Sequence, residues 1–220
     1  MKKVFKNEKC STLQVCLTVL FVSSLLISNV ITAKQVLFPF GITMTGAVFV
    51  FPITYILSDL FSEAYGYRWS RITCYLAFAM NFFMVLVFSL VIKTPYPSYW
   101  GNQEAFQTVL GSTPRVLAAS LLAFVVGDFV NDNVFQKMKE KHSDTKGFWS
   151  RAVVSSLVGE LADSLIFLPI AFLGQMPLKT LAIMTVTQVV LKTGYELIVL
   201  PLTTFFTNKV IKYERSCQND

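Results

Sequence analysis

Charged residues inside apolar stretches are the feature of this sequence with the largest chemical consequence. Eight of them interrupt long apolar runs: Asp59, Glu63, Asp128, Asp132, Glu160, Asp163, Lys192 and Glu196. Three pairs are spaced by three or four residues, which puts each pair on one face of a helix: Asp59 and Glu63, Glu160 and Asp163, Lys192 and Glu196. A charge near the centre of a bilayer costs about 2.5–3.5 kcal/mol on insertion scales. These groups are therefore expected to face one another or water, not lipid.

The balance of these charges favours a polar cavity over simple pairing. Lys192 is one base against seven acids, so it cannot neutralise them all. For any single residue, the alternative that it only clamps two helices together stays open. At a rise of 1.5 Å per residue, four groups fall near mid-membrane: Asp128, Glu160, Lys192 and Glu196. Asp163 lies close by, Asp59 lies deeper in the inner half, and Gln188 extends the polar stripe around Lys192.

Six apolar segments must position these groups. The chain of 220 residues is 54% hydrophobic and 15% charged, whereas soluble domains carry about 25% charged residues. Stretches of about 20 apolar residues, the length that crosses a bilayer, occur at 12–33, 42–64, 72–92, 114–135, 152–173 and 178–207. The expected fold is an all-α bundle of six transmembrane helices forming one domain over 1–220, with a tilt or kink in the last helix near Pro201.

The basic residues predict the orientation of these spans. With the N-terminus inside, 14 of the 19 Lys and Arg residues lie in cytoplasmic segments and four lie outside, with Lys192 left in the sixth span. Because cytoplasmic loops carry the excess of Lys and Arg, both termini are expected in the cytoplasm. The net charge of +6 belongs to these loops and chain ends, so it does not indicate direct nucleic-acid binding.

Residues for catalysis or metal binding are scarce. The four cysteines (Cys10, Cys16, Cys74 and Cys217) form no CxxC pair, and the one histidine, His142, lies in a charged loop. Neither a P-loop nor a nucleophile elbow is present. The sequence therefore predicts no enzyme, no metal site and no cofactor.

Several motifs resemble one known family. They are SN at Ser28–Asn29, GAVFVFPITYILSDLFSEAYG at Gly46–Gly66, GDFVNDNVFQKMK at Gly127–Lys139, GELADSLIF at Gly159–Phe167 and LKTGYELIVLP at Leu191–Pro201. In this order they resemble the queuosine precursor transporter family of six-helix, vitamin-uptake-type membrane proteins. The resemblance implies import of 7-cyano-7-deazaguanine, 7-aminomethyl-7-deazaguanine or queuine, which serve tRNA modification, across a bacterial inner membrane.

The resemblance also implies which residues would bind such a substrate. A guanine-like edge offers two adjacent N–H donors that a carboxylate accepts, and its flat faces suit aromatic side chains. The candidate carboxylates are Glu160 and Asp163, with Asp59 and Glu196 behind them. The aromatic candidates are Phe51, Tyr55 and Tyr195, and the remaining candidate polar groups are Asn29, Asp128 and Lys192.

Two alternatives and one mechanistic question stay open at this point. The chain could be the substrate-binding membrane subunit of an ATP-driven vitamin importer, which has a similar size and helix number. An intramembrane enzyme with paired carboxylates is the other alternative, although no nucleophile-and-base set supports it. The energy for uptake could come from proton coupling through an acid in a span or from trapping of the product after entry.

Overall fold

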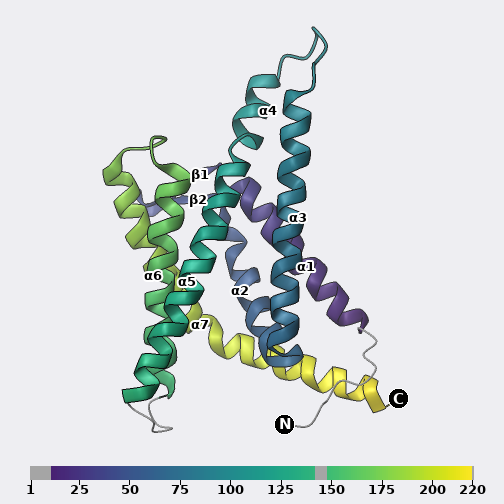
Figure 1. Ribbon diagram of the computed structural model, residues 1–220, viewed down its shortest axis with the longest axis vertical. Helices are drawn as coiled ribbons and strands as arrows, with labels where there is room; N and C mark the ends of the chain where they lie inside the picture. Colours follow the sequence, from purple (N-terminus) through teal and green to yellow (C-terminus); the bar gives the residue numbers. More distant parts are fainter. Residues whose placement is uncertain (1–10, 142–147, 220) are drawn as a thin grey trace.

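The computed structural model describes residues 11–141 and 148–219 of this chain. The predicted cytoplasmic lysines before residue 11, together with Cys10 and His142, lie outside these ranges. The described chain is mostly helical (Figure 1), with helices α1 (Thr12–Ile31), α2 (Phe51–Leu60), α3 (Tyr67–Lys93), α4 (Gln103–Leu110), α5 (Thr113–Lys141), α6 (Phe148–Phe172) and α7 (Leu178–Asn219). Within the described residues, three helical segments are long and apolar enough to cross a membrane: Thr12–Ile31, Arg68–Lys93 and Gln103–Asn131.

Five of the six predicted spans coincide with helices. Segments 12–33, 72–92 and 114–135 correspond to α1, α3 and α5, and segments 152–173 and 178–207 correspond to α6 and α7. Helix α7 is longer than predicted, because it continues to Asn219. Figure 1 shows that α7 first runs beside α6 and then turns to pass beneath α2 and α3.

The predicted helix over 42–64 is wrong in its first nine residues. Strand β1 (Gln35–Leu37) pairs antiparallel with β2 (Thr43–Thr45), and a 3₁₀ turn follows at Gly46–Phe49. Helix α2 begins at Phe51 with Pro52 in its first turn, where a missing N–H costs nothing. It continues as a π-helical turn over Phe61–Tyr65 and ends at Gly66, whose positive φ of 84° suits glycine. The sequence did not predict this break in the helix, because residues 42–50 have an apolar composition.

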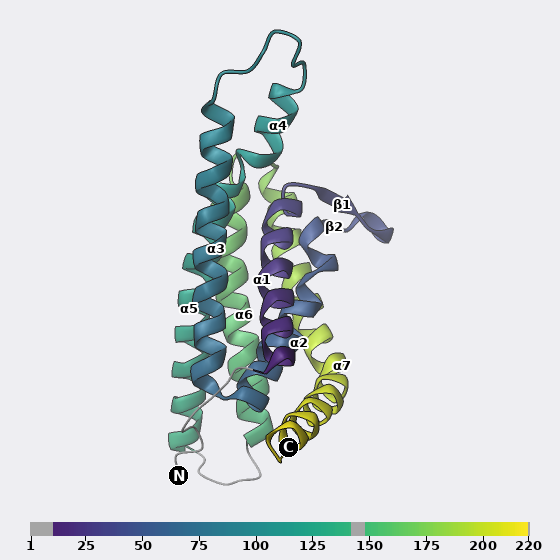
Figure 2. The ribbon, with the colours of Figure 1, turned by 90° about the vertical axis from the view of Figure 1, so that its right-hand side faces the viewer.

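Glycines let α5 and α6 approach each other closely. A Cβ atom added at Gly159 would lie 2.9 Å from the Asn131 Cβ and 3.0 Å from the Gly127 carbonyl oxygen. A Cβ added at Gly127 would lie 3.2 Å from the Cβ of Asp163. The two helices run side by side in both views (Figures 1 and 2). This contact therefore fixes the position of α6 at Asp163.

Two apolar clusters stabilise the bundle. One joins α5, α6 and α7 through residues such as Ala123, Leu168 and Met184. The other joins α1, α2, the π-helical turn and α3 through Phe21, Phe61 and other buried side chains. The clusters therefore define two packed groups of helices, α5, α6 and α7 in one and α1, α2 and α3 in the other.

Glu214 ties the C-terminal part of α7 to two other elements. Its carboxylate accepts a hydrogen bond of 2.8 Å from the Tyr65 hydroxyl and another from the Ser11 hydroxyl. Ser11 is also the N-cap of α1, where its side chain accepts from the Gln14 amide at 3.0 Å. One carboxylate therefore links the start of α1, the π-helical turn and α7.

Tyr65→Phe is expected to destabilise the protein. It removes one hydrogen bond to a charged acceptor, which is worth about 1.5–3 kcal/mol, and leaves the ring in place. Thermal unfolding of the purified protein in detergent should show a lower Tm. Tyr75→Phe is the matched control, because Tyr75 is 64% exposed. Equal Tm values for the two variants would contradict the role of this contact.

Candidate functional site

A cavity of about 320 Å³ lies between the helices. It is lined by side chains from α1, α2, the π-helical turn, α3, α5, α6 and α7. Small-molecule sites in proteins typically have volumes of about 300–1,000 Å³. The cavity is therefore large enough for a small ligand.

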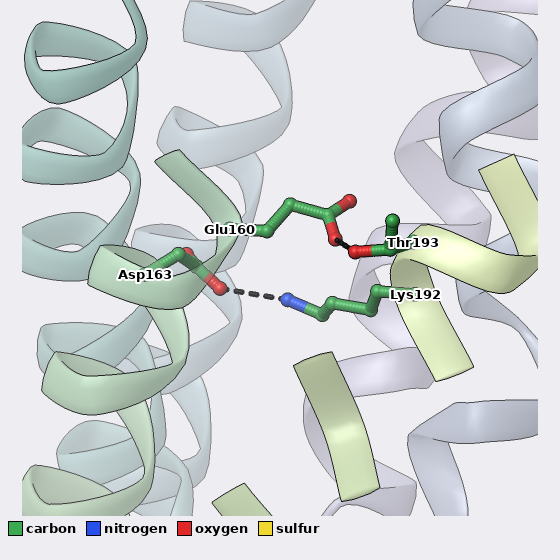
Figure 3. Close-up of polar contacts among 4 residues, drawn as sticks. All are labelled: Glu160, Asp163, Lys192 and Thr193. Carbon is green, nitrogen blue, oxygen red and sulfur yellow. Dashed lines mark hydrogen bonds and ion pairs between the residues drawn. The ribbon is translucent and has the colours of Figure 1, made fainter. Parts of the chain in front are cut away.

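An ion pair between α6 and α7 forms the polar centre of this cavity. The Lys192 Nζ donates to Asp163 Oδ2 at 2.7 Å (Figure 3). The side chains are 8% and 28% exposed, respectively, and both line the cavity. The same Nζ lies 6.0 Å from the centre of the Tyr55 ring on α2. Asp163 therefore keeps an accessible carboxylate edge while Lys192 fixes its position.

Glu160 and Asp163 share a helix face, as their spacing predicts, but they make different contacts. The Glu160 carboxylate accepts a hydrogen bond of 3.2 Å from the Thr193 hydroxyl on α7 (Figure 3). Glu160 is not among the residues that line the cavity. Of this pair, Asp163 is the carboxylate in position to meet a ligand.

A second polar contact joins α1 and α3. The Asn29 amide donates to the Asn81 side-chain oxygen at 2.5 Å, and the Asn81 amide donates to the Ala77 carbonyl oxygen at 2.9 Å. Asn29 lines the cavity, and Asn81 is fully buried behind it. Asn81 was missed in the sequence, although a lone amide in the middle of an apolar span is a visible signal.

Aromatic rings form much of the remaining wall. Tyr55 lines the cavity as predicted, and five phenylalanines line it as well: Phe21, Phe61, Phe78, Phe124 and Phe167. Phe21 and Phe61 meet edge to face at 5.9 Å, and Phe78 and Phe124 lie 5.2 Å apart. Nothing in the sequence separates these five from the other phenylalanines, because the chain has 20 of them.

The structure brings four of the ten predicted site residues to the cavity: Asn29, Tyr55, Asp163 and Lys192. Three others do not line it: Glu160, the exposed Asp59 and the partly buried Tyr195. The side chains of Phe51, Asp128 and Glu196 lie outside the described part of the structure. A role in substrate binding stays a prediction for all ten.

The charge of the lining is less acidic than the sequence suggests. Among the described side chains, one carboxylate, Asp163, and two cations, Lys192 and Arg71, line the cavity. Uncharged polar side chains, among them Ser58, Ser120 and Gln188, also line it. This arrangement suits a ligand that is recognised by hydrogen bonds and stacking.

Comparison with known proteins agrees with a membrane transporter. A family model described as "Putative vitamin uptake transporter" matches residues 45–206. The "Probable queuosine precursor transporter" of Bacillus subtilis is 28% identical over 162 residues, which cover 74% of this chain and 71% of that protein. The "Queuosine precursor transporter" of Escherichia coli is 25% identical over 132 residues, 60% of this chain and 57% of that protein. No solved structure gives a significant match. This chain belongs to the vitamin uptake transporter family, and it is a membrane transporter rather than an enzyme.

Proposed function

We propose that this protein imports queuosine precursors across the bacterial cell membrane for tRNA modification. The precursors are 7-cyano-7-deazaguanine, 7-aminomethyl-7-deazaguanine and queuine. The names of both relatives support this substrate class. The single structural observation that carries the proposal is the Lys192–Asp163 pair, which lies in a cavity with aromatic walls.

The chemistry of this pair matches a guanine-type edge. Such an edge presents a carbonyl oxygen, a ring N–H and an exocyclic amine in a row. The Asp163 carboxylate can accept from the two N–H donors, and the Lys192 ammonium can donate to the carbonyl oxygen. The phenylalanine rings offer surfaces against which the flat bicycle can stack.

The proposed topology has six membrane crossings with both termini in the cytoplasm. The second crossing is interrupted, since the β1–β2 hairpin precedes the short helix α2. Irregular backbone at membrane depth is tolerated where it is buried in protein or lines a cavity. Thr45, Gly46 and Ala47 are buried at this break, and short or broken helices are common around transporter binding sites.

Complementation tests this proposal directly. The gene is expressed in a bacterium that cannot make 7-deazaguanines and has no importer for them, and each precursor is supplied at low concentration. We expect queuosine to reappear in tRNA with at least one precursor, because the chain supplies the missing entry route. Queuine is tested in a host that can insert it into tRNA. Mass spectrometry of tRNA nucleosides gives the readout.

The host should also lack any ATPase of vitamin importers. Rescue in that host would show that the chain works without such a partner. Rescue only when the ATPase is supplied would identify the chain as the substrate-binding subunit of an ATP-driven importer. No rescue with any precursor, despite confirmed membrane insertion, would overturn the substrate assignment.

A further inference from the structure

Gln188 is a buried polar residue of the cavity whose side chain makes no hydrogen bond within the described part of the chain. It is 3% exposed and lies on α7 among the residues that line the cavity. The ion pair of Lys192 and Asp163 and the amide contact of Asn29 and Asn81 show that other polar groups of this wall have protein partners. Gln188 differs from them because its carboxamide is left for whatever occupies the cavity.

The Gln188 carboxamide is accessible from the cavity. Gln188 does not belong to the described residues whose polar side-chain atoms are fully enclosed without a hydrogen-bond partner, so its carboxamide keeps access to the cavity that it lines. Water or a ligand in the cavity can therefore hydrogen-bond to this group. The carboxamide offers a donor and an acceptor side by side, so it suits a ligand edge with the complementary pair.

The position of Gln188 relative to Lys192 indicates which edge this is. The two residues are four positions apart on α7, so they share one face and lie about 6 Å apart along the axis. That separation is comparable to the width of a fused six–five ring system. If Asp163 and Lys192 hold one edge of such a bicycle, Gln188 can reach another of its edges.

We propose that Gln188 reads the N3 and N9–H edge of the substrate and thereby selects free bases over nucleosides. This inference rests on the proposed function and adds a specificity-determining residue to it. In a 7-deazaguanine the ring N3 is an acceptor and the neighbouring N9–H is a donor. The Gln188 nitrogen donates to N3, and its oxygen accepts from N9–H. A nucleoside carries its sugar on N9, so it lacks this donor and places a bulky group against the carboxamide.

The test compares 7-cyano-7-deazaguanine with its 9-methyl derivative in cells or vesicles that contain the protein. We expect the wild type to take up the free base at least 10-fold faster than the methylated base. Gln188→Met, which has similar size but lacks both hydrogen-bonding groups, should take up the free base at least ~10-fold more slowly. Its preference for the free base should fall to about 2-fold or less. Gln175→Leu is the matched control, because Gln175 is exposed in the turn after α6.

The outcomes separate this inference from the proposed function. A wild type that takes up neither compound would overturn both. A wild type that takes up both compounds equally, or a Gln188→Met variant that keeps the full preference, would overturn this inference alone. If Gln188→Met fails to reach the membrane, Gln188→Asn serves instead. It keeps the amide but is one methylene shorter, and the same loss of preference is expected.

Discussion

Asp163→Asn is expected to reduce uptake of 7-deazaguanines by about 100-fold, the loss expected for two charge-assisted hydrogen bonds to the substrate. Lys192→Met should reduce uptake by a similar factor. It removes the donor to the substrate's carbonyl oxygen, and it also removes the ion pair that holds the Asp163 carboxylate in place. The measurement is initial uptake of labelled precursor at equal protein abundance. Glu104→Gln and Lys179→Met are matched controls, since both residues are exposed and lie away from the cavity.

The double variant Asp163→Asn with Lys192→Met separates recognition from scaffolding. Each single change leaves a partly buried charge without its partner, whereas the double change removes both charges. We therefore expect the double variant to unfold at a higher temperature than either single variant. Its uptake should stay as low as theirs. Recovery of uptake in the double variant would mean that the pair only holds α6 and α7 together.

Five of the six apolar runs correctly predicted helices. The prediction failed at 42–50, because hydropathy reports burial in an apolar environment and not backbone conformation. Thr43, Thr45 and Gly46 give a weak strand-and-turn signal that the surrounding Phe and Val residues mask. The full length of α7 was also missed, since most residues after 207 are polar or charged and give no membrane signal.

The candidate site was predicted in part, and the reason lies in helix geometry. Spacing along one helix correctly placed Glu160 and Asp163 on a common face, but it cannot say which residue of a neighbouring helix each one meets. The structure pairs Lys192 with Asp163 and gives Glu160 the hydroxyl of Thr193 instead. Contacts between helices depend on tilt and rotation, which are set by packing details such as the glycine contact of α5 and α6.

That glycine contact should be the most sensitive packing feature of the bundle. In Gly159→Ala the new methyl group would lie 2.9 Å from the Asn131 Cβ and 3.0 Å from the Gly127 carbonyl oxygen, both too close for relaxed contact. Backbone atoms cannot rotate away, so α5 and α6 must move apart. Overpacking of this kind costs about 1–3 kcal/mol. We expect a lower Tm in detergent and less folded protein in the membrane.

Gly194→Ala on α7 is the control, because no described atom beyond the neighbouring backbone of its own helix lies within 4 Å of the position that its Cβ would occupy. Alanine has the higher helix propensity by about 1 kcal/mol, so this variant should be as stable as the wild type or more stable. Gly127→Ala completes the series. Its methyl group would lie 3.2 Å from the Asp163 Cβ, so it should lower uptake more than its loss of stability explains. Equal stability of the Gly159→Ala and Gly194→Ala variants would show that α5 and α6 do not meet at these glycines. The position of Asp163 would then need another explanation.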